Sequence, residues 1–173
     1  MNDIKMAPFS NESESSIIGS IFREPDRIHE AMSLIDPEDL FSRDMRIIYS
    51  AMIKLKRKDQ PIDLITLADE LKNQNKFDDV GGVYKLSTLE DYTPTATAIA
   101  FHCRKVRALA IKRKFIDKME GIVNTAFEVN DDASTLLDEA HSSVFQLMGE
   151  VDSNSKTVDV YSPEDMAVRG YKN

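Results

Sequence analysis

Cysteine, glycine, proline and tryptophan are scarce in this chain of 173 residues, which has one Cys, six Gly, six Pro and no Trp. The lone cysteine, Cys103, excludes an intrachain disulfide and a metal site built from several cysteines, and it favours a reducing, cytoplasmic setting. With an aromatic share of only 8%, the composition also disfavours the turn-dense β-sandwiches and barrels. The composition therefore predicts a helical protein.

Long apolar runs and a positive net charge are also missing. No stretch approaches the roughly 20 apolar residues of a membrane span, and the first residues lack the positive start and apolar core of a signal peptide. The 22 Lys+Arg and 30 Asp+Glu give a formal net charge of -8. This charge argues against sequence-independent nucleic-acid binding as the main role, although a local basic patch could still bind phosphates. We expect a cytoplasmic protein without a membrane partner.

The first half of the chain shows apolar residues at helical spacing, interrupted by turns. Ser10 supplies N-cap chemistry before an isoleucine-rich segment, so a first helix is expected to begin near residue 11 and to end at Pro25. The same spacing predicts further helices around Asp26–Ser33, Met45–Leu55, Leu64–Leu71 and Val83–Leu89, with Asp63 as an N-cap. These short helices indicate a compact bundle.

The second half has a different texture. From about Thr95 to Phe127 the sequence contains no Pro and one Gly, which predicts a helix roughly 45–50 Å long. After a polar turn, a second amphipathic arm begins at Ala133, and the two arms would form an αα-hairpin. Gly149 to Lys156 is expected to be a flexible linker, and Pro163 is expected at the first position of another helix.

The sequence therefore predicts an all-α fold. It would consist of a compact helical head of about five or six short helices, a long antiparallel helical hairpin and the start of a linker helix. The expected boundaries are 1–93 for the globular head, 94–150 for the hairpin, which we expect to dimerise, and 151–173 for the linker with the start of its helix.

Apolar residues at heptad-like spacing along the hairpin are expected to form a self-association seam. They are Val106, Leu109, Ile116, Met119 and Val123 on the first arm and Leu136, Ala140, Val144 and Leu147 on the second. The first arm is locally basic and the second is acidic, so opposite charges would pair the arms of one chain or the hairpins of two chains. The residues expected to pair are Arg104, Lys105, Arg107, Lys112 and Arg113 with Asp138 and Glu139.

Two alternatives explain the same charge pattern. Both charged faces could simply be solvated, or the basic arm could contact the phosphate backbone of a nucleic acid. The basic arm lacks the interleaved exposed aromatic residues on which bases would stack.

The sequence shows no catalytic constellation. No Gly is followed by Lys, so the 173 residues contain no Walker-type phosphate loop. His29, His102 and His141 lack the spacing of metal ligands and are expected at helix surfaces or core edges. Cys103 is expected to be a small buried apolar residue rather than a nucleophile. We therefore expect no catalytic residue, metal or cofactor in this chain.

Four short motifs occur in order between residues 8 and 89. They are Pro8, Ser10, Glu12, Glu14 and Ile17-Ile18-Gly19; Leu40-Phe41 followed by Arg46-Ile47-Ile48-Tyr49; Gln60-Pro61-Ile62-Asp63-Leu64-Ile65-Thr66-Leu67; and Gly81-Gly82-Val83-Tyr84-Lys85-Leu86. Followed by a hairpin of this size, they resemble the N-terminal domain of the DnaB-type replicative DNA helicases of bacteria and their phages. Ser13 and Met45 stand where that family usually has Ala and His.

The resemblance implies a non-catalytic domain of a larger protein. In this family the heads and hairpins form a collar on a hexameric ring, and the hairpins pair between subunits, as dimers or as a trimer of dimers. The collar is associated with primase and, in several systems, with the helicase loader. A separate RecA-like motor domain binds DNA, ATP and Mg and gives the parent its ATP-dependent 5'-3' helicase activity. The resemblance thus predicts that this chain is a fragment of a bacterial or phage-encoded helicase.

Two other hypotheses compete with this one. The chain could be a free-standing adaptor that mimics the helicase collar and binds primase or loader; a natural reading frame several hundred residues longer, with a Gly-Lys-Ser/Thr loop, would exclude it. An independent small enzyme is the third possibility, which the lack of a catalytic set disfavours.

Overall fold

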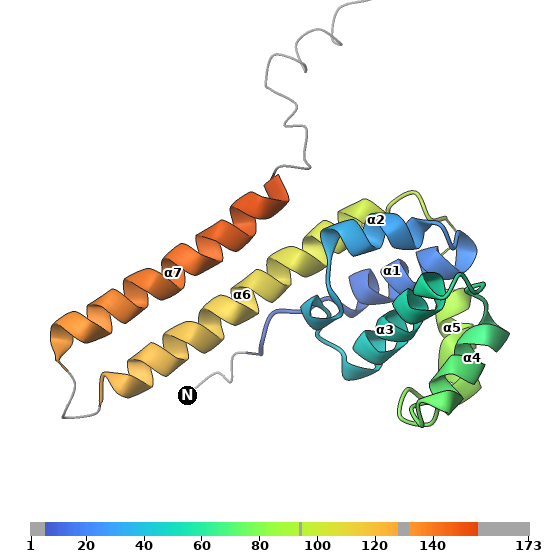
Figure 1. Ribbon diagram of the computed structural model, residues 1–173, viewed down its shortest axis with the longest axis horizontal. Coiled ribbons are helices and arrows are strands. Elements are labelled where there is room, and N and C mark those ends of the chain that lie inside the picture. Colours follow the sequence, from blue (N-terminus) through green and yellow to red (C-terminus); the bar gives the residue numbers. More distant parts are fainter. Residues whose placement is uncertain (1–5, 94, 128–131, 156–173) are drawn as a thin grey trace, which may run out of the picture. The chain divides into compact units, whose positions relative to one another are not determined.

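The computed structural model describes residues 6–93, 95–127 and 132–155, and these residues contain helices and no strand (Figure 1). The α-helices are α1 (Asn11–Arg23), α2 (Arg27–Leu34), α3 (Arg43–Arg57), α4 (Leu64–Asn73), α5 (Gly82–Glu90), α6 (Ile99–Thr125) and α7 (Ala133–Ser155), and a short 3-10 helix, η1 (Pro37–Asp39), follows α2. The predicted all-α fold is confirmed. The chain divides into two compact units, Met1–Ile116 (the first unit) and Asp117–Asn173 (the second unit).

Side-chain caps set the starts of two helices. The backbone N–H of Ser13 donates to Ser10 Oγ at 3.4 Å, and that of Thr66 donates to Asp63 Oδ1 at 2.8 Å. Each bond satisfies one of the N–H groups that have no partner within the first turn of a helix. α1 and α4 therefore begin directly after Ser10 and Asp63, as the sequence predicts.

The core of the first unit is built around α1 and α3. Ile17, Ile18 and Ile21 of α1 and Ile48 and Tyr49 of α3 are all 0% exposed. Full burial of a side chain such as isoleucine contributes about 1.5–3 kcal/mol. α1 also packs against α2 and α5, and α3 also packs against α4 and η1. Between them, α1 and α3 therefore contact α2, α4, α5 and η1.

A buried carboxylate joins α3 to α4. The side chain of Glu70 is 4% exposed and accepts from Lys54 Nζ at 2.6 Å and from Lys58 Nζ at 2.9 Å. With a third bond from Gln74, these hydrogen bonds lower the pKa of Glu70 from 4.5 to about 2. Because the folded pKa is depressed, Glu70 stabilises the fold above pH 4.5, and this contribution disappears as the pH falls toward 2.

The beginning of α6 completes the core of the first unit. Ile99, Cys103 and Val106 lie on one face of α6, are at most 1% exposed and belong to the core cluster. Burial raises the pKa of the Cys103 thiol to about 12, so the thiol stays protonated and unreactive. The prediction that Cys103 is a small buried apolar residue is confirmed.

α7 is longer than the sequence predicts. It begins at Ala133, as expected, but continues to Ser155, so the flexible linker predicted to begin at Gly149 is wrong as far as Ser155. One glycine inside a helix costs only about 1 kcal/mol relative to alanine, which is too little to end a helix of this length. The helix predicted to start at Pro163 lies outside the described residues.

Gly19 allows α1 to approach the segment at the end of α5. A Cβ atom built on Gly19 would lie 2.8 Å from Leu89 O and 3.1 Å from Thr93 Oγ1. We expect Gly19→Ala to lower the free energy of unfolding by about 1–3 kcal/mol, because overpacking forces the backbone of one segment to move. Urea denaturation followed by circular dichroism measures this change.

Gly121→Ala is the matched control, since Gly121 also lies inside a helix. A Cβ atom there meets nothing within 4 Å. Alanine should leave the stability unchanged or raise it by up to about 1 kcal/mol, through its better helix propensity. Equal losses of stability in both variants would contradict the packing role of Gly19.

Candidate functional site

The described residues show no cluster of metal-binding side chains. Among them, no group of three or more His, Cys, Asp or Glu side chains could hold a metal ion. His102 Nδ1 lies 3.3 Å from Ser13 Oγ, and burial lowers the pKa of this histidine. His29 and His141 are exposed. In the same residues no helix is long and apolar enough to cross a membrane.

A buried ion pair joins η1 to α6. The Asp39 side chain is 1% exposed, and Arg107 Nη1 donates to its Oδ1 at 2.6 Å and to its Oδ2 at 2.8 Å. The backbone N–H of Asp36 donates to Asp39 Oδ2 at 2.9 Å. The Arg107 side chain is only 17% exposed. Both charges are thus largely buried. Removing one partner of such a buried pair destabilises the fold by far more than the intact pair stabilises it.

Arg113 ties α6 to the segments that flank the ion pair. Its Nη2 donates to Asp39 O at 2.6 Å, and its Nη1 donates to Pro8 O at 2.8 Å. Its guanidinium carbon lies 5.5 Å from the centre of the Phe41 ring, which stacks on Phe9 with 4.7 Å between ring centroids. One side of α6 therefore fixes both the segment before α1 and the loop after η1.

A second buried acid holds the same loop from within the core. Glu14 of α1 is 1% exposed, and its carboxylate accepts from the backbone N–H of Phe41 at 2.7 Å and of Ser42 at 3.1 Å. Ser42 is the N-cap residue of α3, and its own side chain makes no capping bond. Glu14 thereby fixes the backbone at the start of α3 with a charge-assisted pair of hydrogen bonds.

Sequence reasoning missed the partners of these buried acids. Asp39 occupies the N3 position of a capping box in η1, a role that its local sequence can account for. Its second partner, Arg107, lies 68 residues further along the chain. No local spacing in the sequence connects residues so far apart. The signal that the sequence did offer for a buried acid was the position of Asp39 directly before an apolar residue, Leu40, which is buried.

The residues predicted for charge pairing fall into two groups. Arg107 and Arg113 are bonded to Asp39 within the first unit, as described above. The others are exposed on the surfaces of their helices: Arg104, Lys105 and Lys112 on α6, and Asp138 and Glu139 on α7. Pairing of these exposed charges within one chain or between two chains stays a prediction.

The residues predicted for the seam on α6 also differ in burial. Val106 lies in the core of the first unit at 1% exposure, and Leu109 is half-buried. Ile116 is 39% exposed. Within the second unit, Met119 is half-buried and Val123 is 54% exposed. Val106 thus packs inside its own chain, and Ile116 and Val123 are the members of the α6 set that leave most apolar surface uncovered.

The second unit brings the end of α6 beside α7. Lys118 Nζ of α6 donates to Gln146 Oε1 of α7 at 2.8 Å, and the two helical segments run side by side in Figure 1. On α7, Leu136 and Ala140 are half-buried and Leu147 is 5% exposed. These three residues recur at four and seven positions, as expected of one apolar face of a helix.

α7 carries a second apolar face that is exposed. We call this face the outer stripe; its members are Leu137, Val144, Met148 and Val151, which are 68%, 38%, 58% and 46% exposed. They recur at steps of seven, four and three residues, the spacing of a coiled-coil seam. Val144 was among the predicted seam residues. A contiguous exposed apolar stripe on a helix is typical of a surface that associates with another chain.

The buried ion pair of Asp39 gives a test of how the first unit holds α6. We expect Asp39→Asn to lower the free energy of unfolding by about 2–4 kcal/mol, because Arg107 stays largely buried without its counter-charge. Thermal and urea denaturation of the two proteins measure the difference. Restoration of part of the loss by a second change, Arg107→Met, would show that the uncompensated charge is the cause.

Glu38→Gln is the matched control at the neighbouring position. Glu38 is 82% exposed and lies 3.6 Å from Arg46. Exposed pairs of this kind contribute at most about 1 kcal/mol, so this variant should retain nearly full stability. If Asp39→Asn were as stable as Glu38→Gln, the buried ion pair would not hold α6 in place.

Comparison with known proteins shows which family has this sequence and fold. A family model described as "DnaB-like helicase N terminal domain" matches residues 6–108, which is more than half of the chain. The structure also resembles the crystal structure of the N-terminal domain of DnaB helicase from Mycobacterium tuberculosis, with a TM-score of 0.75 and 22% identity over 82% of this chain and 99% of that one. That likeness confirms the fold.

Longer proteins match the chain over most of its length. The chain is 28% identical to the replicative DNA helicase DnaC of Bacillus subtilis strain 168, over 100% of this chain and 37% of that protein. It is 29% identical to the replicative DNA helicase DnaB of Geobacillus stearothermophilus, over 83% of this chain and 32% of that protein. This chain thus spans about a third of each of these relatives.

A further solved structure is that of a DnaB-like replicative helicase, described together with its interactions with primase. It matches with a TM-score of 0.65 and 26% identity, over 87% of this chain and 36% of that one. The resemblance inferred from the four sequence motifs is confirmed. The chain belongs to the family of DnaB-like helicase N-terminal domains.

Proposed function

We propose that this chain is the non-catalytic N-terminal collar domain of a hexameric replicative DNA helicase. It would mediate assembly of the subunits and dock primase, the helicase loader or both. The parent would unwind duplex DNA in the bacterial cytoplasm, using ATP and Mg in a motor domain that also makes the main contacts with DNA. The observation that carries the proposal is the exposed outer stripe of α7 on a chain of this family.

Assembly is supported by the contrast between the two faces of α7. One face is turned away from solvent, whereas the outer stripe exposes Leu137, Val144, Met148 and Val151. Burial of each such side chain against a second chain would contribute on the order of 1–3 kcal/mol. A second copy of α7 has the same heptad-like spacing, so its outer stripe would pack against this one and cover it. We therefore assign the outer stripe to subunit pairing.

Docking of primase is supported by relatives rather than by a particular contact. A solved DnaB-like replicative helicase, which matches 87% of this chain, is described together with its interactions with primase. The first unit is compact and its loops are fixed by buried ion pairs and hydrogen bonds. Such a pre-organised surface lowers the ordering cost of binding a partner. Primase is therefore the partner that we propose, with the loader as a second one.

Self-association can be tested at Val144, in the middle of the outer stripe. We expect Val144→Glu to weaken association by about tenfold or more, because it places an unpaired carboxylate in an apolar seam. Sedimentation velocity over a range of protein concentrations measures the equilibrium. The wild-type chain should sediment as a dimer or a larger assembly at high concentration.

Ser142→Glu is the control, since Ser142 is an exposed polar residue of α7 that is not part of the outer stripe. It adds the same charge to the same helix and should leave association unchanged. A wild-type chain that is monomeric at every concentration would refute the assembly function. Equal weakening by both variants would show that net charge, rather than the outer stripe, governs association.

A further inference from the structure

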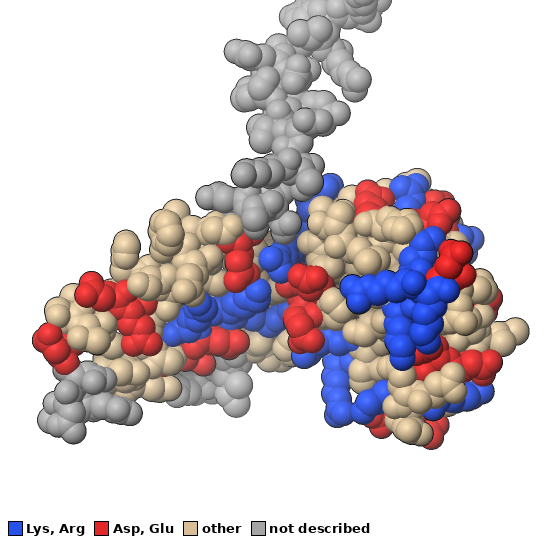
Figure 2. Space-filling view, viewed as in Figure 1, with Lys and Arg blue, Asp and Glu red and all other residues tan. Residues whose placement is uncertain are grey.

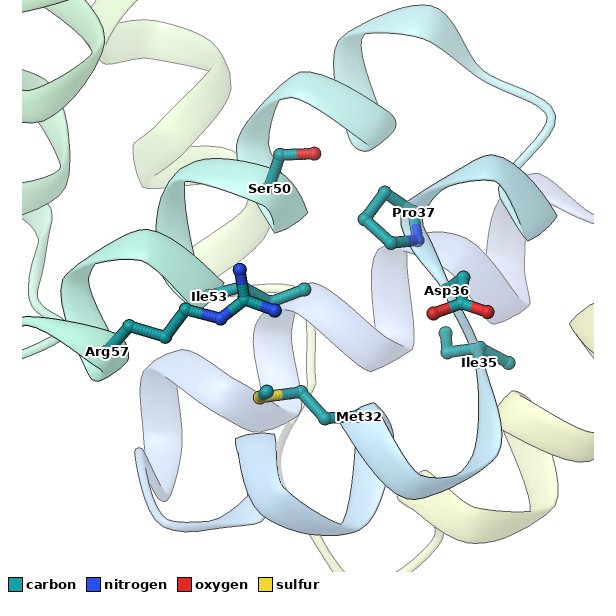
Figure 3. A pocket seen from close by; sticks show the side chains of 7 residues that line it. All are labelled: Met32, Ile35, Asp36, Pro37, Ser50, Ile53 and Arg57. Atoms are coloured by element: carbon teal, nitrogen blue, oxygen red, sulfur yellow. The ribbon is translucent and has the colours of Figure 1, made fainter.

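Among the concave sites on the described part of the first unit, two differ in whether their charged side chains are paired within the chain. One lies between the start of α3 and α5, where Arg43 Nη2 is 3.9 Å from Asp79 Oδ2 and Lys85 Nζ is 2.8 Å from Asp44 Oδ2. Its charges are therefore neutralised within the chain. The other is a cleft of about 260 Å³ among α2, η1 and α3, which we call the α2–α3 cleft (Figure 3).

The α2–α3 cleft has a small apolar floor, formed largely by side chains of the core, between polar walls. Ile35 and Ile53 are 3% and 8% exposed and belong to the core, and Met32 and Pro37 complete the apolar lining. The hydroxyl of Tyr49 donates to Ile35 O at 3.4 Å from below. The cleft is smaller than the roughly 300–1,000 Å³ of small-molecule and cofactor pockets. Its size suits one or two apolar side chains.

Arg57 stands at one end of the cleft without an acidic partner among the described residues. Its neighbours at the end of α3 are all paired: Lys54 and Lys58 with Glu70, and Lys56 with Asp26. No ion pair joins Arg57 to any described residue, and its side chain reaches over the cleft toward Ile53 and Met32 in Figure 3. Figure 2 shows Lys and Arg side chains gathered where α3 ends. This end of the cleft therefore favours an anionic group.

The opposite end of the cleft has the opposite charge. Asp36 lies across the cleft from Arg57 in Figure 3 and is exposed. A phosphate backbone would meet this carboxylate and an apolar floor, both of which disfavour nucleic acid. A peptide can satisfy all three features at once: an apolar side chain on the floor, a carboxylate at Arg57, and a basic or amide group at Asp36.

We propose that the α2–α3 cleft is a docking site for a peptide segment of a partner protein, in which an apolar residue has an acidic neighbour on one side and a basic neighbour on the other. This inference rests on the proposed docking function and names the chemistry of the segment and the residues that receive it. Arg57 binds the acidic group, Asp36 selects against a second acid, and Met32 and Pro37, above the buried Ile35 and Ile53, receive the apolar side chain.

Three fluorescein-labelled hexapeptides test the proposal by fluorescence anisotropy with the complete chain. Each has two central leucines; one carries two lysines before them and two glutamates after them, the second carries glutamates on both sides, and the third carries lysines on both sides. The mixed peptide should bind most tightly. Equal binding of all three peptides would overturn the proposal.

Two variants and a control locate the binding site. Arg57→Gln should weaken binding of the mixed peptide by about fivefold, the value of one exposed ion pair, and Ser50→Trp, at the wall of the cleft, should abolish it. Arg43→Gln removes the same charge from the other end of α3, where the side chain is 79% exposed, and should change nothing. Equal weakening by Arg43→Gln and Arg57→Gln would overturn the proposal.

Purified primase from the same replication system separates the failure of this inference from the failure of the proposed function. If primase binds the wild-type chain and Ser50→Trp equally well and no peptide binds, the α2–α3 cleft is not a docking site and the docking function stands. If the mixed peptide binds through Arg57 but primase does not bind, the cleft is supported and the docking of primase is refuted.

Discussion

The ion pair between Asp39 and Arg107 is the contact on which the arrangement of the first unit depends. It joins Asp39 of η1 to α6, a helix that begins 60 residues later in the chain. Arg107 Nη1 lies 2.6 Å from Asp39 Oδ1 and 2.8 Å from Asp39 Oδ2, and the Asp39 side chain is 1% exposed. Arg113 uses the main-chain oxygen of the same aspartate. Because buried charges need their partners, this cluster holds the part of α6 between Arg107 and Arg113 against η1 and the segment before α1.

Local chemistry explains why most helices could be predicted. Ser10 and Asp63 cap α1 and α4 with their own side chains, so three or four neighbouring residues contain the whole signal. The burial of Cys103 follows from its place on the apolar face of α6, between Ile99 and Val106. The continuation of α7 through Gly149 was mispredicted, since a single glycine weakens a helix without ending it.

Long-range partners could not be predicted in the same way. Heptad spacing selects apolar positions on a helix but does not say what covers them: Val106 packs in the core of its own unit, whereas Val144 is exposed. Likewise, a run of basic residues does not reveal that Arg107 is bound by Asp39 while Arg104 is at the surface. These outcomes depend on how elements distant in sequence meet, which periodicity does not encode. The α2–α3 cleft could not be predicted from the sequence for the same reason, because α2, η1 and α3 together form it.

We propose different roles for the two units: the first is stabilised by its own core, and α7 supplies apolar surface for a second chain. Hydrogen exchange measured by mass spectrometry, on dilute and on concentrated wild-type chain, tests this division directly. The account predicts slower exchange with rising concentration in α7 and unchanged exchange in α1 and α3. Slower exchange confined to α1 and α3, or no dependence on concentration anywhere, would contradict it.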